Sequence, residues 1–358
     1  MTAFFQLVEG PAPEPDLHHH GDRDLGDGLV DLAVNVRVMA PPDWLAAVII
    51  DSVSRLAAYP DPGPAAQAIA DAYGLDLDQV LPTAGGAETF TLLARALPTH
   101  HPVVVHPQFT EPEAALLAAG RRPQRHPLAP ETGFVLDAEL VPSEADLVMI
   151  GNPTNPTSVL HRADEIRRLV RPGRVVVVDE AFMDAVPGEP ETMIRGAMTG
   201  LVVLRSLTKT WGLAGLRAGY AVGDRDVIAA MRRQQPPWSV STPAIAATVA
   251  CLSPDARQQA ASMAAEVVLQ RHHLVSRLAE LGLSAVAEPR APFVLVDSSR
   301  LCPGRPPGWL RLALRGQGFA VRRGETFPGL TADWIRIAVR DPAITDRLTA
   351  AIRAVIAA

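Results

Sequence analysis

The chain has 358 residues, of which 48% are hydrophobic and 20% charged, and its 33 basic and 39 acidic side chains leave a net charge of −6. This hydrophobic fraction suffices for a full core and excludes intrinsic disorder, while the acidic balance excludes the basic footprint of a nucleic-acid-binding protein. No uninterrupted apolar run approaches the roughly 18 residues of a membrane-spanning helix, so we expect neither nucleic acid nor a membrane as partner.

Residues 1–42 are predicted to form an N-terminal arm that packs with the C-terminal part of the chain. The arm begins as a polar, proline-rich stretch without helical or strand period. Three consecutive histidines, His18 to His20, suggest a metal, but no further ligands stand at a useful spacing, so we predict no metal site. The start lacks the basic region of a secretory signal. The only cysteines, Cys251 and Cys302, cannot form a disulfide framework, so we expect a cytoplasmic protein.

Residues 43–252 are predicted to form a large α/β domain, because short apolar runs alternate with helical segments. The predicted strands are 103–105, 146–150, 175–178, 201–204 and 218–222. The predicted helices are 43–57, 64–73, 87–96, 111–119 and 162–170. Continuous β-branched runs separated by helices indicate a parallel sheet that is covered on both faces.

Residues 253–358 are predicted to form a smaller α+β domain. A long helix over 254–281 precedes strands at 293–296, 319–321 and 334–339. Helices are expected near 307–314 and 341–356.

Lys209 is the only lysine, since the other 32 of the 33 basic residues are arginine. A surface lysine retained by chance is one explanation. The other is chemical, because arginine can replace lysine as a cation but not as a nucleophilic amine. Lys209 follows a predicted strand, with hydroxyls at Ser206 and Thr208 and a guanidinium at Arg217. This pattern suits an aldehyde cofactor with a phosphate: the amine forms the Schiff base, and the hydroxyls and guanidinium bind the phosphate.

Three further features suit the same cofactor. Asp179 ends an apolar strand, where a buried carboxylate can pair with a protonated pyridine nitrogen or merely cap a helix. Asn155, in an Asn-Pro-Thr stretch, can donate to the 3′ oxygen of the ring or serve as a turn residue. Gly85, Gly86 and Ala87 stand at a predicted helix start, where free N–H groups and the helix dipole can hold a phosphate.

Together these residues resemble the aspartate-aminotransferase superfamily of pyridoxal-phosphate enzymes (fold type I), and within it the branch of histidinol-phosphate aminotransferases and threonine-phosphate decarboxylases. The resemblance covers nearly the whole chain. Its most specific stretches are 59–61 (YPD), 179–182 (DEAF), 204–209 (LRSLTK), 231–240 (MRRQQPPWSV) and 335–340 (IRIAVR). It implies a mainly parallel, seven-stranded sheet in a large cofactor domain, a smaller α+β domain, and pyridoxal 5′-phosphate as the cofactor.

The resemblance also implies a role for each matching residue. Lys209 is the Schiff-base lysine, Asp179 pairs with the pyridine nitrogen, and Asn155 pairs with the 3′ oxygen. The residues implied to hold the cofactor phosphate are Gly86, Ala87, Ser206, Thr208 and Arg217, with Tyr59 reaching it from the partner subunit of a homodimer with shared sites. The residues implied to bind substrate are Arg336 at the carboxylate and Arg322, Asn35 and His20 at the substrate phosphate. Arg322 or its neighbour could instead be a solvated charge, and the arm histidine could be free.

The sequence departs from the family pattern at several positions. Ser158 replaces a glycine, and Arg37 stands where the decarboxylases carry an asparagine. Pro112 occupies the place of a tyrosine that commonly covers the cofactor ring, which leaves Phe109 or another group to stack there. Phe182 lacks the hydroxyl that many transaminases aim at the 3′ oxygen. These changes put the rate and the substrate in doubt, but not cofactor binding.

A small phosphorylated amino acid or amine is the expected substrate. The stretches 179–182 and 237–240, together with His20, favour the threonine-phosphate decarboxylase of cobalamin biosynthesis. Histidinol-phosphate transamination with 2-oxoglutarate is the alternative. The departures motivate a second alternative, a weakly catalytic paralogue with a scaffold or regulatory role. A nucleotide-binding module would leave Lys209 and Asp179 unexplained.

Overall fold

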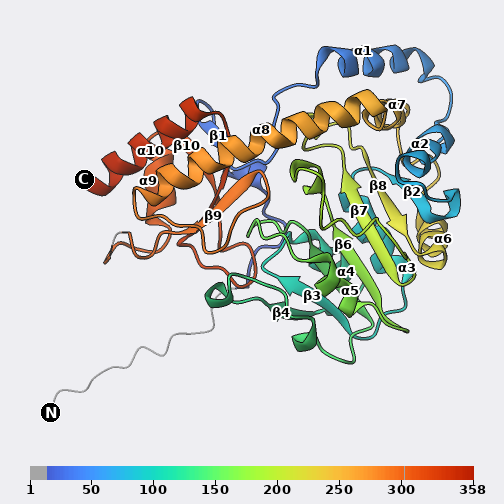
Figure 1. Cartoon of the computed structure of the whole chain (residues 1–358), viewed down its shortest axis with the longest axis horizontal. Coiled ribbons are helices and arrows are strands. Elements are labelled where there is room, and N and C mark those ends of the chain that lie inside the picture. The colour runs from blue at the N-terminus through green and yellow to red at the C-terminus, as the bar shows by residue number, and fades with distance from the viewer. Residues whose placement is uncertain (1–13, 302) are drawn as a thin grey trace.

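The computed structural model describes residues 14–301 and 303–358, which form a larger and a smaller layered unit (Figure 1). Residues 1–13 and Cys302 lie outside the described residues. The prediction that the chain begins without a secretory signal rests mostly on residues 1–13, so it also falls outside them. Within the described ranges, no helix has the length and apolar character needed to cross a membrane.

The larger unit contains a seven-stranded sheet in the order β2-β8-β7-β6-β5-β3-β4. Only β8 runs antiparallel to its neighbours, so the predicted mainly parallel sheet is confirmed. Its strands are β2 (Val80–Thr83), β3 (Pro102–His106), β4 (Gln124–Pro127), β5 (Leu147–Gly151), β6 (Val175–Asp179), β7 (Leu201–Ser206) and β8 (Gly219–Gly223).

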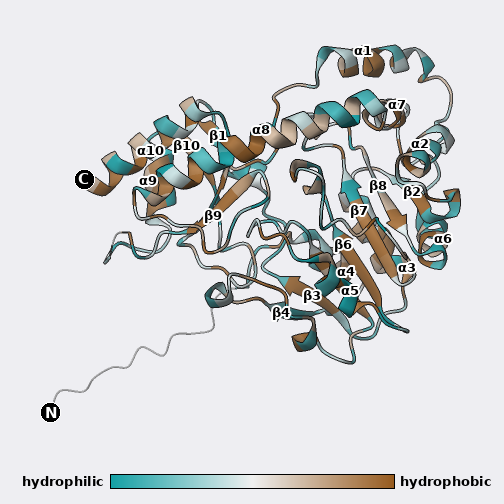
Figure 2. Ribbon diagram, in the orientation of Figure 1, coloured by the Kyte–Doolittle hydropathy of each residue, from teal (hydrophilic) through white to brown (hydrophobic). Residues whose placement is uncertain are grey.

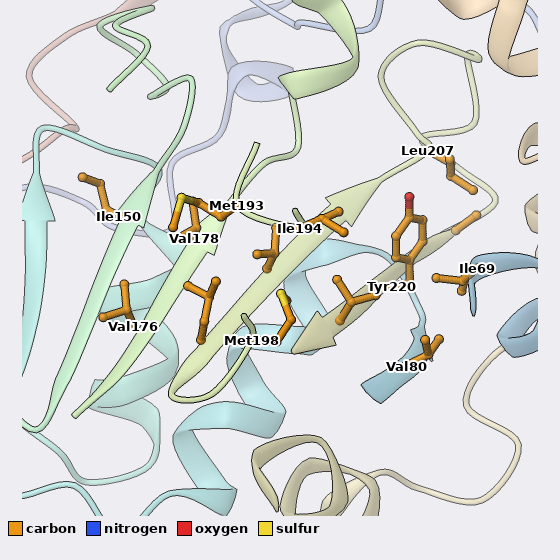
Figure 3. Packing of buried hydrophobic residues seen from close by; sticks show 14 of the residues in the cluster. Ile69, Val80, Ile150, Val176, Val178, Met193, Ile194, Met198, Leu207 and Tyr220 are labelled. Atoms are coloured by element: carbon orange, nitrogen blue, oxygen red, sulfur yellow. The ribbon is translucent and has the colours of Figure 1, made fainter. Parts of the chain in front are cut away.

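Both faces of this sheet are buried, which explains why its central strands are almost continuously apolar. Along β6, Val176 and Val178 point into one core, whereas Val177 points into the other. Figure 3 shows the first of these cores, where Met193 and Ile194 cover the strand residues. Because successive side chains of a strand face opposite sides, a run of valines serves both layers at once.

Ten α-helices lie in the described ranges. They are α1 (Asp43–Ser52), α2 (Gly63–Tyr73), α3 (Gly86–Ala96), α4 (Glu111–Ala118), α5 (Ala163–Leu169), α6 (Arg225–Gln234), α7 (Thr242–Cys251), α8 (Pro254–Ala279), α9 (Trp309–Gly316) and α10 (Pro342–Ala357). Short 3₁₀ helices cover Gly21–Asp24, Val53–Arg55, Leu77–Gln79, Pro130–Thr132, Ala138–Leu140 and Met183–Ala185.

The smaller unit contains a four-stranded sheet in the order β1-β10-β11-β9. Its strands are β1 (Val30–Leu32), β9 (Phe293–Asp297), β10 (Phe319–Arg323) and β11 (Trp334–Ala338). The arm contributes β1, which pairs in parallel with β10. Figure 2 colours β9 as largely hydrophobic, as it does β3 and β7 of the larger sheet.

Helix α8 connects the two units and runs across the upper part of Figure 1. Ala256, near its start, lies in a core of the larger unit, whereas Leu274 and Leu278 lie in the core of the smaller one. One continuous helix therefore spans both hydrophobic cores.

Several elements differ from the sequence prediction. The helix predicted over 43–57 ends at Ser52 and continues as the 3₁₀ helix Val53–Arg55. Strands β1, β2 and β4 and helices α6 and α7 were not predicted. Strand β1 has only three residues, too few to show a period, and it exists because β10 supplies its hydrogen-bonding partners.

Candidate active site

A cavity of about 560 Å³ lies at the C-terminal ends of β6 and β7, between the two sheets and beneath the arm. Most of the predicted site residues line it, namely His20, Asn35, Gly86, Ala87, Phe109, Asn155, Asp179, Ser206, Thr208, Lys209, Arg217, Arg322 and Arg336. Gly85 and Tyr59 do not line it. Residues separated by more than 300 positions in the sequence thus meet at one edge of the parallel sheet, where ligands bind in open α/β folds.

Lys209 lies in the turn after β7 with its amine in this cavity. Burial lowers the pKa of Lys209 from 10.5 to about 8, and the nearby guanidiniums of Arg336 and Arg217 act in the same direction. Asp179 and Asp22 oppose the shift, but more weakly. A lysine in this environment has a larger fraction of neutral, nucleophilic amine near neutral pH than an ordinary lysine.

Asp179 stands at the end of β6, where its carboxylate accepts a hydrogen bond of 2.9 Å from the Ala181 N–H. Burial raises its pKa from 3.8 to about 6, although that hydrogen bond and the charge of Lys209 lower it. A buried carboxylate of this kind is stabilised when a ligand brings a protonated nitrogen to it. This is the charge that a pyridinium ring would supply.

The N-terminus of α3 and Arg217 form the opposite end of the cavity. Gly85 precedes α3 with φ 78°, and a Cβ atom placed on it would lie 2.6 Å from Nη2 of Arg217. Glycine therefore suits the left-handed backbone at this position, and a side chain there would push the guanidinium away from the helix N-terminus. The Ser206 and Thr208 hydroxyls lie nearby, 2.7 Å from each other. Hydroxyls, a guanidinium and a helix N-terminus together fit a phosphate.

Arg336 projects from β11 and is buried. Its two terminal nitrogens donate to Oδ1 of Asn155 and to the carbonyl of Ala33, whereas Nε is buried without a partner. Among the described residues, it forms no ion pair with a carboxylate. Burial holds its pKa well below the usual value, and the charge of Arg322 lowers it further. A buried guanidinium without a counter-charge favours an anionic ligand.

Arg322, which pairs with Arg336 across β10 and β11, has a different environment. One of its terminal nitrogens donates to Oδ2 of Asp24 at 3.3 Å, and the other donates to the carbonyl of His19 at 2.7 Å. Its guanidinium also stacks 4.7 Å from the Phe327 ring centre. Asp24, which the sequence interpretation did not single out, therefore gives this arginine a carboxylate partner, which it shares with Arg323, whose Nε lies 2.8 Å from Oδ1 of Asp24. Arg322 is no solvated surface charge, but it is also not a free anion receptor.

The arm closes one side of the cavity. His20 Nε2 lies 2.7 Å from Oε1 of Glu111, and its ring lies 5.6 Å from that of Phe109. The arm histidine is therefore bound rather than free. Asn35 is buried in the cavity wall, and its Oδ1 has no partner. Glu111, which the sequence interpretation missed, lies directly beside the predicted stacking residue Phe109.

Ser158 adopts φ 65°, the left-handed region in which glycine is favoured. Its hydroxyl accepts a 2.8 Å hydrogen bond from the Ala291 N–H, and its carbonyl accepts one of 2.8 Å from the Arg290 N–H. These contacts tie the loop after β5 to the smaller unit. A glycine at this position would keep the carbonyl contact to Arg290 but would lack the hydroxyl contact to Ala291.

Two other departures are accommodated by packing. Phe182 is buried and meets Phe293 edge-on, with ring centres 5.0 Å apart. Pro112 is buried in the first turn of α4, and Phe109 faces the cavity in front of it. Phe109 is the aromatic side chain that the loop offers to a planar ligand.

Tyr59 lies outside the cavity of its own chain. It is 76% exposed and stacks on Trp238, which is 57% exposed, with ring centres 4.2 Å apart. Two large exposed aromatic side chains, stacked on each other from two different loops, favour a contact with another molecule.

Comparison with known proteins reveals likenesses over nearly the full chain. Residues 27–352 match the family described as aminotransferase class I and II. The chain is 45% identical over 332 residues to a histidinol-phosphate aminotransferase of Mycobacterium tuberculosis, which covers 92% of this chain and 88% of that protein. It is 30% identical over 350 residues to the threonine-phosphate decarboxylase of Salmonella typhimurium, covering 92% of both. Its fold is similar to the crystal structure of the histidinol-phosphate aminotransferase from Clostridium acetobutylicum, with a TM-score of 0.82 and 20% identity over 92% of this chain and 99% of that one.

Proposed function

Because this chain belongs to the family of class I and II aminotransferases, we propose that it moves the amino group of histidinol phosphate to 2-oxoglutarate. Its cofactor is pyridoxal 5′-phosphate, whose ring, when bound, takes up the electron pair released at the substrate Cα. The relative that is 45% identical is named for this substrate, whereas the decarboxylase is 30% identical. The proposal therefore reverses the preference for decarboxylation that the sequence motifs suggested.

We assign the residues around the cavity as follows. Lys209 supplies the amine that bonds to the cofactor aldehyde, and Asp179 holds the ring nitrogen. Asn155 is assigned to the 3′ oxygen. The lowered pKa of Lys209, about 8, also suits a base that takes the proton from the substrate Cα near neutral pH. The groups assigned to the cofactor phosphate are the α3 N-terminus after Gly85, with Gly86 and Ala87, and the side chains of Ser206, Thr208 and Arg217.

The observation that supports this reaction best is the unpaired, buried guanidinium of Arg336 beside the compensated one of Arg322. In the first half-reaction the amino donor, which has no carboxylate, brings a single anionic group, its phosphate, to the substrate end of the cavity. In the second half-reaction 2-oxoglutarate brings two carboxylates. We assign the free guanidinium of Arg336 to the phosphate first and then to one of these carboxylates.

Decarboxylation of threonine phosphate is the second candidate. That substrate, unlike histidinol phosphate, carries a carboxylate and a phosphate together, so the amino-acid substrate itself needs two cationic groups at the same time. His20 and Arg322 line the cavity and would be the second anion site. In the described structure, however, Asp24 and Glu111 engage them, so the second site would require these carboxylates to be displaced.

We further propose a homodimer in which Tyr59 reaches the cofactor phosphate of the partner subunit. The α1 end and the following turn expose Ile50 at 70%, Val53 at 53% and Leu56 at 54%, next to the stacked Tyr59 and Trp238. Tyr59→Phe should weaken cofactor retention by about 0.5–3 kcal/mol, the range for one hydrogen bond. Sedimentation of the wild-type protein as a fully active monomer would contradict the shared site.

The deciding experiment is product analysis with purified enzyme. Histidinol phosphate plus 2-oxoglutarate should give glutamate and the corresponding ketone, whereas threonine phosphate should release little carbon dioxide. Rapid carbon dioxide release from threonine phosphate would favour the second candidate. A cofactor absorbance that changes with neither substrate would support the scaffold or regulatory alternative.

A further inference from the structure

A buried carboxylate on the reverse side of the Lys209 turn takes no part in the assignments above. Asp184 lies in the 3₁₀ helix Met183–Ala185, which follows β6. Its Oδ2 accepts a 2.5 Å hydrogen bond from the hydroxyl of Thr210, the residue directly after Lys209. Thr210 is 1% exposed, so this hydrogen bond is formed away from water.

The peptide bond between Lys209 and Thr210 is also held. The Arg37 N–H donates to the Lys209 carbonyl at 3.1 Å, so the arm secures the lysine's own peptide group. The Lys209 turn is thus fixed at its carbonyl by Arg37 and at the next side chain by Asp184. The amine itself projects into the cofactor cavity on the opposite side.

Asp184 occupies an unfavourable environment. Burial raises its pKa from 3.8 to about 6, and the charge of Glu189 acts in the same direction. The Thr210 hydrogen bond and the charges of Arg205 and Arg37 oppose this shift. Its second oxygen, Oδ1, is buried without a partner. Asp184 also lines a second cavity, of about 650 Å³, on the far face of β7. A buried polar atom without a partner is destabilising, so stability alone does not explain a carboxylate here.

We propose that Asp184 is a positioning residue that holds Thr210, and thereby the Lys209 backbone, so that the lysine amine stays in the water-poor part of the cofactor cavity. The inference rests on the proposed role of Lys209. Asp184 acts through its hydrogen bond, because the charges that act on the Lys209 amine are those of Arg336, Arg217, Asp179 and Asp22.

The single lysine makes a direct test possible. An amine reagent such as formaldehyde with a reductant labels only Lys209 and the α-amino group, and mass spectrometry of the digested full-length, cofactor-free protein separates the two. The pH dependence of Lys209 labelling gives its pKa, which should be about 8 in the wild-type protein. Thr210→Val keeps the shape but removes the donor, and Asp184→Ala removes the acceptor. Both should raise the Lys209 pKa by about one unit or more towards 10.5, because the freed amine reaches water.

Conservative variants separate positioning from mere packing. Thr210→Ser keeps the hydroxyl and Asp184→Asn keeps an acceptor oxygen, so both should titrate within about half a unit of the wild-type protein. Unchanged titration in folded Thr210→Val protein would overturn the proposal, and this variant decides the matter even if Asp184→Ala does not fold. A Lys209 pKa near 10.5 in the wild-type protein would also overturn it. Product analysis with histidinol phosphate is independent, so a failed substrate assignment would not be confused with a failed positioning role.

Discussion

Replacing Arg336 with glutamine should impair both half-reactions of the proposed transamination to a similar extent. Glutamine keeps a neutral amide donor on β11 but is shorter than arginine, so the change removes the charge together with the two hydrogen bonds that the terminal nitrogens of Arg336 donate to Asn155 and to the Ala33 carbonyl. A charge-assisted hydrogen bond contributes about 1.5–3 kcal/mol, which corresponds to roughly a 10- to 150-fold loss in kcat/KM. We expect a loss in this range with histidinol phosphate and again with 2-oxoglutarate.

The two half-reactions can be measured separately by following the absorbance of the bound cofactor in single turnovers. One starts with histidinol phosphate and the aldehyde form, and the other with 2-oxoglutarate and the amine form. Arg340→Gln is the matched control, because Arg340 follows the same strand, is also partly buried and donates to the carbonyls of Val34 and Val339. It lies outside the cavity lining, so it should change both rates less than about threefold.

The loss must appear in both half-reactions for the reasoning to hold. If the 2-oxoglutarate step fails while histidinol phosphate still reacts at the wild-type rate, another group binds the substrate phosphate. Arg322 and His20 would then be that group, and Asp24 would have to release Arg322 when substrate enters. Stability provides a second check: Arg336→Gln should not lower the unfolding free energy of the cofactor-free protein, because it removes an uncompensated buried charge.

Three further changes have defined outcomes. Lys209→Arg should abolish the cofactor's lysine-bound absorbance, because arginine retains the charge but lacks a usable amine, and retention of that absorbance would exclude Lys209 as the bonding residue. Asp179→Asn should weaken cofactor retention yet stabilise the cofactor-free protein at pH 7 by up to about 3 kcal/mol, because the wild-type carboxylate has its pKa raised from 3.8 to about 6. Below pH 3.8 the Asp179 carboxyl carries its proton in both the folded and the unfolded wild-type protein, so the substitution should change the unfolding free energy little there. The increase in unfolding free energy, measured by urea unfolding, should grow between pH 3.8 and 6. An increase that does not depend on pH would show that the raised pKa of Asp179 is not its cause. Ser158→Ala should cost about 1–3 kcal/mol of unfolding free energy by leaving the buried Ala291 N–H without its acceptor, whereas an unchanged urea midpoint would show that this hydrogen bond contributes nothing.

The sequence is sufficient to predict that the side chains proposed to hold the cofactor meet in one cavity, because each of them follows a regular element. Asp179 ends β6, Ser206 ends β7, and Asn155 follows β5 closely. The carboxyl ends of parallel strands meet at one edge of the sheet, so recognising the strands is enough to bring these side chains together. A single lysine among 33 basic residues then indicates which amine the proposed chemistry uses.

The three acidic residues that the sequence did not reveal have partners that are distant in the sequence. Asp24 contacts Arg322 across 298 positions of sequence, Glu111 contacts His20 across 91, and Asp184 contacts Thr210 across 26. None of these acids belongs to a periodic pattern, because each lies in a 3₁₀ helix or at the first residue of a helix. Their partners are set by the tertiary fold, so no local signal in the sequence predicts them.

This distinction explains why the motifs did not decide between the two reactions. Arg322 and Arg336 stand opposite each other on β10 and β11, and both line the cavity, so the motifs present two equivalent cations. The arm makes them unequal. The pairing of β1 with β10 brings Asp24 onto Arg322 and leaves Arg336 with neutral partners only. In the reaction that we propose, the free guanidinium of Arg336 takes the single phosphate of the amino donor and then one carboxylate of 2-oxoglutarate. The difference between the two arginines on which this proposal rests comes from the arm, whose three-residue strand has no recognisable sequence pattern.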